Sequence, residues 1–277
     1  MPDNLDLFED GGASFEELAQ ANGTAWWRSR DLMRALGYAT EASFSKVIQR
    51  AQQACLVLNI PLEDNFRREE VIEGPRTVFE YRLTRFACYL VAMNADSKKP
   101  QVAASQVYFA DLAQTVKDAL SDPESVERVL VRDELTGGIK SLQSTAKSHG
   151  VVHFAFFHDA GYRGMYNMSL KKLMHRKGVP RGQVLFDFMG RRELAANLFR
   201  VTQTEEKIRN DRTRGQRALE HTAETVGRKV RQTMIDLGGT SPEQLPIREP
   251  IQKVRSGLRK TSRVFRKLDS TARPSVD

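Results

Sequence analysis

Apolar residues recur at helical spacing along most of the chain. In the segment that begins near Thr40, five apolar residues are separated by 3, 1, 3 and 4 positions, which places them on one face of a helix. They are Phe44, Val47, Ile48, Ala51 and Cys55. Similar periodicity predicts further helices over residues 30–36, 85–94, 192–210 and 222–237, and others beginning near residues 100, 123 and 169. The chain is therefore predicted to be mainly α.

Polar and glycine residues mark the expected ends of these helices. Ser29, Thr84 and Ser169 each precede an apolar-periodic segment, so we expect their hydroxyls to cap the first turn. Gly37 suits the left-handed position that closes a helix. A Gly-Gly pair at residues 137–138 lies inside a helical pattern and predicts a kink or a break.

One segment departs from the helical period. Residues 78–83 alternate in the manner of a half-buried strand, and Val71 and Ile72 precede a Glu-Gly-Pro turn signal at residues 73–75. These patterns predict a β-hairpin. The order helix, turn, helix, hairpin, helix gives the N-terminal part an α+β, winged-helix-like character, followed by a helical C-terminal domain.

We divide the chain into four parts on these patterns and on charge. Residues 1–22 form an acidic arm, residues 23–120 a winged-helix-like domain, residues 121–246 a helical domain, and residues 247–277 a basic tail that we expect to be flexible. An apolar seam at residues 102–116, spaced 3, 4, 3 and 4, can pack inside the domain or against another copy. We take it as a hint of a homodimer.

Charge narrows the class of partner. The chain has 43 Lys and Arg against 35 Asp and Glu, a net charge of +8. Residues 1–24 carry six acidic and no basic residues, while residues 248–277 carry nine basic and three acidic residues. The middle of the chain is therefore basic in its own right, which favours an anionic partner.

Location follows from two further features. The longest apolar run, residues 86–93, is too short to span a membrane, and the acidic N-terminus lacks the basic and apolar regions of a secretory signal. Cys55 and Cys88 lie in apolar helical settings, which is typical of buried thiols in a reducing compartment. We expect no membrane contact and a cytoplasmic, nucleoid-associated location.

The first candidate site for DNA lies in the N-terminal domain. Polar residues occupy the face of the second helix opposite its apolar face, at a spacing that lets Lys and Arg meet phosphates and Gln reach base edges. Further arginines flank the first helix and the hairpin. The predicted set is Arg28, Arg34, Lys46, Gln49, Arg50, Gln53, Arg67, Arg68 and Arg76. An ordinary solvated helix face is the alternative.

A second candidate lies near the C-terminus. Arg228, Lys229 and Arg231 occur on the last predicted helix, and the tail beyond it carries six more basic residues at residues 255–267. Basic arms supply non-specific affinity for DNA by releasing counterions. A disordered, solubilising tail is the alternative.

Other chemistry finds less support. The aromatic residues Trp26 and Trp27, and the phenylalanines of residues 154–157, are more often core than stacking platforms for bases, and Gly161-x-x-Gly164 is predicted to be a turn. His149 and His153 are separated by Gly150, so they do not predict a zinc site. No nucleophile or phosphate-binding motif occurs, and no Asp/Glu cluster of the kind a nuclease needs for its metal. We predict no cofactor, no metal and no enzymatic activity.

Several segments carry a resemblance. Trp27-x-x-Arg30-Asp-Leu followed by Leu36-Gly-Tyr resembles the opening of BRO-N domains, which occur in phage antirepressors and viral DNA-binding proteins. Residues 85–94, 99–110, 161–166, 193–207 and 226–233 resemble the bacterial DNA-damage-inducible protein D family. This resemblance implies a cytoplasmic protein of the DNA-damage (SOS) response that interferes with filaments of the strand-exchange recombinase. It carries over no catalytic residues.

Two functions from different classes remain open at this point. The chain is predicted to be a non-enzymatic DNA-binding protein that modulates or inhibits recombinase filaments on single- or double-stranded DNA. The alternative is an antirepressor-like interaction module that binds a repressor or the recombinase directly, without DNA, its acidic arm imitating the charge of DNA.

Overall fold

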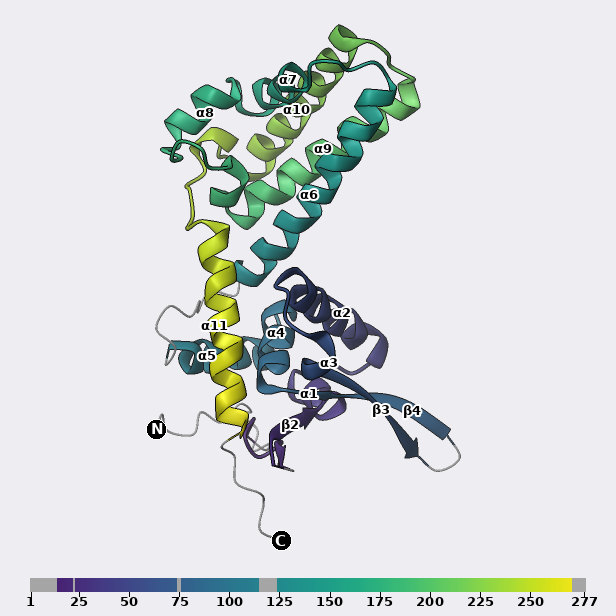
Figure 1. Ribbon diagram of the computed structural model, residues 1–277, viewed down its shortest axis with the longest axis vertical. Coiled ribbons are helices and arrows are strands. Elements are labelled where there is room, and N and C mark those ends of the chain that lie inside the picture. Colours follow the sequence, from purple (N-terminus) through teal and green to yellow (C-terminus); the bar gives the residue numbers. More distant parts are fainter. Residues whose placement is uncertain (1–13, 22, 74–75, 115–123, 271–277) are drawn as a thin grey trace. The chain divides into compact units, whose positions relative to one another are not determined.

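The protein divides into two compact units. The structure is a computed structural model that describes residues 14–21, 23–73, 76–114 and 124–270 (Figure 1). The first unit comprises Met1–Val129 together with Lys253–Asp277, and the second comprises Leu130–Gln252. The fold is mainly α with an α+β N-terminal part, as predicted. The first 13 residues of the acidic arm and the expected boundary near residue 120 lie outside the described ranges.

A small antiparallel sheet organises the first unit, in the strand order β1-β2-β4-β3. Its strands are β1 (Gln20–Ala21), β2 (Ala25–Arg28), β3 (Phe66–Glu73) and β4 (Arg76–Leu83). The predicted hairpin is confirmed, and it extends from the other elements of its unit (Figure 1). It is longer than the sequence pattern indicated. The first half of β3 is charged, and an edge strand whose sides are both largely exposed shows no apolar alternation.

Helices make up most of the rest of the first unit where the structure describes it. They are α1 (Ser29–Ala35), α2 (Glu41–Val57), α3 (Leu62–Asn65), α4 (Arg85–Asn94), α5 (Pro100–Gln114) and α11 (Ile251–Ser270). The helix predicted over residues 85–94 is confirmed as α4, and all ten of its residues are buried. Thr84 caps α4 by accepting a hydrogen bond from the Ala87 N–H at 3.2 Å. Ser29 does not cap α1, because its Oγ accepts from the Tyr81 N–H of β4 instead, at 3.0 Å.

The basic tail is not flexible where the structure describes it, which corrects the sequence prediction. Residues 251–270 form α11, whose apolar face packs in the core of the first unit. Phe265 is fully buried and its ring lies 5.9 Å from that of Tyr89. Arg85 Nε donates to Asp269 Oδ1 at 2.9 Å, and both side chains are almost fully buried. A basic amphipathic helix therefore has one face in the core and one in water.

The apolar seam of residues 102–116 serves the same core. Val102, Ser105 and Phe109 are buried within the first unit, and the Phe109 ring contacts those of Phe15 and Tyr89. These side chains are therefore not available to a second copy, so the seam no longer supports a homodimer. The homodimer itself stays a prediction.

The second unit is helical. Besides most of α6 (Glu124–Ser148), it contains the α-helices α7 (Phe154–Tyr166), α8 (Leu170–Arg176), α9 (Arg191–Asp211) and α10 (Gln216–Gly238). Two short 3-10 helices, η1 (Leu185–Phe188) and η2 (Pro242–Gln244), belong to the same unit. Ser169 caps α8 as predicted, its Oγ accepting from the Lys172 N–H. The pair Gly137-Gly138 does not break α6, which continues through both residues to Ser148. Over the ranges described, no helix is both long and apolar enough to cross a membrane.

Glycines let α7 and α10 approach closely, which corrects the prediction that Gly161-x-x-Gly164 is a turn. Both glycines lie inside α7. A Cβ on Gly164 would lie 2.1 Å from the carbonyl oxygen of Glu224, and a Cβ on Gly227 would lie 2.7 Å from the carbonyl oxygen of Gly161. The backbones of the two helices are therefore in contact where side chains normally separate them.

Candidate nucleic-acid interface

The polar face of α2 is the most open part of the predicted site. Lys46, Gln49, Arg50 and Gln53 are all exposed and line a shallow hollow along the helix, opposite the buried apolar face. The capping of α2 by Thr40, whose Oγ1 accepts from the Ser43 N–H, fixes where that face begins. Within the part of the chain that the structure describes, neither Lys46 nor Arg50 has an ion-pair or hydrogen-bond partner. Their charges are free to meet an anion.

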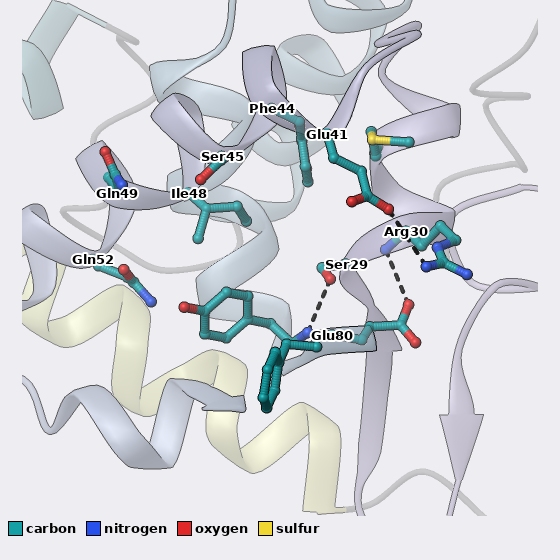
Figure 2. A pocket seen from close by; sticks show the side chains of 12 residues that line it. Ser29, Arg30, Glu41, Phe44, Ser45, Ile48, Gln49, Gln52 and Glu80 are labelled. Carbon is teal, nitrogen blue, oxygen red and sulfur yellow. Dashed lines mark hydrogen bonds and ion pairs between the residues drawn. The ribbon is translucent and has the colours of Figure 1, made fainter. Parts of the chain in front are cut away.

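A pocket joins α2 to the hairpin (Figure 2). It has a volume of about 250 Å³, and Phe44, Ile48, Phe79 and Tyr81 supply its apolar lining. Gln49 of the exposed α2 face is also part of the lining, together with Gln52. The polar face of α2 and the pocket are therefore continuous through one glutamine.

Polar bonds at the pocket hold α1 against β4. Glu80 is buried and its Oε1 accepts from the Arg30 N–H at 3.2 Å, while Arg30 Nη2 lies 3.4 Å from Glu41 Oε1 (Figure 2). The N–H of Arg30 is one of the free amides at the start of α1, so the Glu80 carboxylate does the work expected of the Ser29 hydroxyl. These contacts fix the position of α1 on the sheet.

The hairpin divides its arginines between two faces. Arg68 stands opposite Tyr81, and its guanidinium lies 3.7 Å from the centre of the Phe79 ring, so it belongs to the side of the sheet that faces α2. Arg67 points to the reverse side, since neighbouring residues of a strand alternate. Arg76 begins β4, but its side chain lies outside the described set.

The register places three arginines in one row on that reverse side. Arg28 of β2 pairs with Arg82 of β4, which pairs in turn with Arg67 of β3. The neighbouring row, Trp27, Leu83 and Phe66, is buried and faces the core. Like charges directly opposite each other across a sheet repel, so this row favours an anionic neighbour.

We define the arginine row as Arg28, Arg82 and Arg67; the next row on the same side of the sheet pairs Glu69 with Glu80, so two carboxylates lie beside it. The Arg82 guanidinium lies 4.3 Å from the centre of the Trp26 ring. Arg67 is 3.8 Å from Glu69, and the side chains of Arg67 and Glu69 are both exposed. Sequence reasoning missed Arg82. The strand alternation was visible, but the pairing of Arg82 with Arg28 depends on a register that the sequence does not state.

The remaining predicted residues of the first unit are less distinctive. Arg34 is exposed and lies 3.8 Å from Asp31, one turn away on α1. Of the aromatic candidates, Trp27 and Phe157 are buried in their cores, whereas Trp26 is half-buried beneath Arg82. Trp26 is thus the one of these three with a ring beside the cationic surface.

The second predicted cluster, on α10, does not form one surface. Arg231 is half-buried and makes a bidentate ion pair with Glu243, and it also donates to the Met165 carbonyl at 3.1 Å. These hydrogen bonds lower the pKa of the Glu243 carboxyl and raise the pKa of the Arg231 guanidinium. Arg228 is paired with Glu224 at 3.0 Å, and Lys229 is exposed. Arg231 holds the end of its unit together, and of the three cations only Lys229 has no ion-pair partner among the residues that the structure describes.

The pocket of the first unit combines apolar and polar side chains. Across the described ranges, no group of three or more His, Cys, Asp or Glu side chains is arranged to hold a metal. Beside its apolar lining the pocket offers two amides, the Arg30 guanidinium and two carboxylates, of which Glu80 accepts from the Arg30 N–H and Glu41 lies 3.4 Å from Arg30 Nη2. A pocket with these side chains can bind a planar or apolar group against its apolar lining and hydrogen-bond a polar edge of that group at its rim.

Comparison with known proteins identifies both halves of the chain. Residues 16–113 match the N-terminal domain of the BRO family, and residues 122–254 match the DinD C-terminal domain. Neither is an enzyme family. The chain is 41% identical over 252 residues to the DNA damage-inducible protein D of Escherichia coli K12, an alignment that covers 84% of this chain and 90% of that protein. The chain therefore belongs to the DNA damage-inducible protein D family.

Proposed function

We propose that the chain is a non-enzymatic DNA-binding protein of the bacterial DNA-damage response, which acts in the cytoplasm at the nucleoid and modulates recombinase filaments on DNA. The observation that carries the proposal is the exposed face of α2, where Lys46 and Arg50 have no partner among the described residues. The Escherichia coli relative is a DNA damage-inducible protein, which supports the connection with DNA damage. The recombinase part extends the family resemblance and is tested separately below.

Two surfaces of the first unit are suited to a polyanion. The first, which we call the α2 surface, comprises Lys46, Gln49, Arg50, Gln53 and Arg68. The second is the arginine row on the reverse side of the sheet. A helix that presents Lys, Arg and Gln can lie in a groove, with the cations on phosphates and the amides on base edges. The arginine row consists of guanidinium groups, which suit the phosphates of a backbone.

The test is DNA affinity as a function of salt. We expect the purified full chain to bind labelled single-stranded or duplex DNA in fluorescence anisotropy, and to bind it less tightly at 200 mM than at 50 mM salt, because phosphate contacts release counterions. The double variant Lys46→Glu/Arg50→Glu should lose affinity and reduce the salt slope by about one for each contact removed.

A matched control separates a surface from net charge alone. Lys140 and Arg217 are exposed in the second unit and have no described partner, so Lys140→Glu/Arg217→Glu changes the net charge equally. Equal losses in both double variants would refute the α2 surface. The triple variant of the arginine row to glutamine then reports whether Arg28, Arg82 and Arg67 carry the remaining affinity.

The recombinase proposal needs its own measurement. With DNA-bound recombinase filaments, we expect the wild type to change filament lifetime and the α2 double variant to lose that effect in proportion to its DNA affinity. Absence of DNA binding at 50 mM salt, with the filament effect intact, would replace the proposal with direct binding to the recombinase. Light scattering tests the homodimer, which should weigh twice the 31.4 kDa of one chain.

A further inference from the structure

A large groove in the second unit is lined mainly by apolar side chains. Its volume is about 1230 Å³, and its lining comes from α6, α7, α8, α9 and the segment of residues 179–186. Phe156 and Val184 line it and are 61% and 49% exposed, and Met174 lies beside them. Drug-sized pockets usually measure ~300–1,000 Å³, so the groove has room for a segment of chain.

A buried and unpaired arginine lies in this groove. Arg200 of α9 is 4% exposed and is part of the lining. Its Nε and Nη2 share one neutral acceptor, Asn197 Oδ1, at 3.3 and 3.2 Å. Among the described residues no carboxylate forms an ion pair with it, and its guanidinium stands 5.3 Å from the centre of the Tyr162 ring. A buried guanidinium without an anion is costly, since it has lost water and gained no counter-charge.

Other hydrogen-bonding groups line the groove beside Arg200. The Tyr162 hydroxyl has no described partner, although the residue is 6% exposed. His158 and Gln143 also line the groove, their Nε2 atoms 3.0 Å apart. Burial and the charge of Arg200 lower the pKa of His158. A guanidinium, a phenol and an amide are the donors that receive a carboxylate.

Charge around the groove has one dominant sign. Lys171 and Arg181 line it and are exposed. Asp159 is the acidic residue of the lining, and both its oxygens are engaged, Oδ1 by the Leu170 N–H and Oδ2 by Arg163. An incoming carboxylate therefore meets cations at the rim and an unpaired cation inside.

We propose that this groove binds an acidic peptide segment of a partner protein, with one carboxylate on Arg200 and apolar side chains against Phe156, Met174 and Val184. A nucleic acid would place a charged backbone along a mainly apolar lining, which favours a peptide instead. A small amphipathic acid would satisfy Arg200 but leave most of the groove unfilled. The site is independent of the DNA surfaces and does not rest on the proposed function.

The probe is a pair of matched peptide pools. Each pool contains eight-residue peptides with Leu or Phe at alternate positions. The remaining positions are Asp or Glu in the acidic pool and Asn or Gln in the amide pool. The tagged full chain is incubated with both pools, and retained peptides are quantified by mass spectrometry. We expect the acidic pool to be retained about tenfold better, because charge-assisted hydrogen bonds to a buried guanidinium are worth that factor or more.

Variants distinguish the groove from general attraction to a basic protein. Arg200→Gln should abolish the preference for the acidic pool, and Tyr162→Phe should weaken it about threefold by removing one hydroxyl donor. Phe156→Ser should lower retention of peptides by loss of apolar contact. The matched controls are Arg209→Gln on the same helix and Phe199→Ser, a similarly exposed phenylalanine outside the lining. Circular dichroism and melting verify that each variant is folded.

Four results would overturn the proposal. Equal retention of both pools by the wild type would show that no carboxylate is recognised. Full retention of the acidic pool by both Arg200→Gln and Tyr162→Phe would show that the peptides do not bind in the groove. Displacement of bound peptides by a single-stranded oligonucleotide would assign the groove to nucleic acid. Saturable binding of decanoate that needs Arg200, without enrichment of any peptide, would assign it to small acids.

Discussion

Replacing Gly164 with alanine tests the close packing of α7 on α10. The added Cβ would lie 2.1 Å from the Glu224 carbonyl oxygen and 3.0 Å from the Arg228 backbone nitrogen. Both atoms belong to the backbone of α10, so no side chain can rotate away. Ordinary contact begins near 3.4 Å, and the two helices must therefore separate by more than 1 Å at this point.

Two opposing effects set the size of the change. Alanine in place of glycine inside a helix gains about 1 kcal/mol. Forcing extra volume into a packed core costs ~1–3 kcal/mol and more where the backbone must move. Because the separation spreads along α7, we expect the upper part of that range to prevail, with a net destabilisation of about 2 kcal/mol. In a unit of this size that lowers the Tm by ~4–8 °C.

The control is a glycine with open space. Gly137 lies in α6 and a Cβ there would meet nothing within 4 Å, so Gly137→Ala should keep its helical gain and raise stability by ~0.5–1 kcal/mol. Both variants are compared by thermal and urea unfolding monitored by circular dichroism. If Gly164→Ala melted at or above the temperature of the wild type, the reasoning from backbone contact would be refuted.

Three further expectations follow from the packing and the charges. Glu243→Gln should lower the free energy of unfolding by about 1 kcal/mol at pH 7. Because Arg231 holds the pKa of Glu243 in the folded protein below its usual value near 4.5, this difference from the wild type should shrink below pH 4.5 and vanish once the pH is below the lowered pKa, which urea titrations at several pH values measure. Burial raises the pKa of Cys55 to about 12 and that of Cys88 well above its usual range, so neither thiol should react with iodoacetamide at pH 8 until urea unfolds the chain, and rapid native labelling would contradict this. Phe265→Ala should cost ~3–5 kcal/mol and expose α11 to limited proteolysis, whereas an unchanged cleavage pattern would show that α11 is held by other contacts.

Local patterns predicted the elements well where one face of each element meets one core. The apolar spacing of α2 and the hydroxyl of Thr84 depend on residues within a few positions, so the sequence states them directly. Gly161 and Gly164 were harder, because a glycine pair serves a turn and a close helix contact equally well. The difference lies in Gly227, about 65 residues away, which the sequence does not connect to them.

The errors in the candidate site have the same origin. Arg82 enters the arginine row only through the pairing of β4 with β2, and Arg231 leaves the basic cluster only because Glu243 folds back onto it. The basic face of α11 was visible, but its buried face needs Tyr89 and Arg85, which are distant in sequence. Charge alone therefore indicated where cations are abundant, and the fold determines which of them are already paired.

The docking of α11 bears on how the chain folds during synthesis. The first unit is interrupted by the 123 residues of Leu130–Gln252, so its last helix leaves the ribosome long after its other elements. At a synthesis rate of ~5–20 residues per second, the interval is about 6–25 s. During this interval Tyr89 lacks its contact with Phe265, and Arg85 lacks its ion pair with Asp269. A stop codon shortly before residue 253 would leave every residue of the α2 surface in place and still deprive that surface of its finished scaffold.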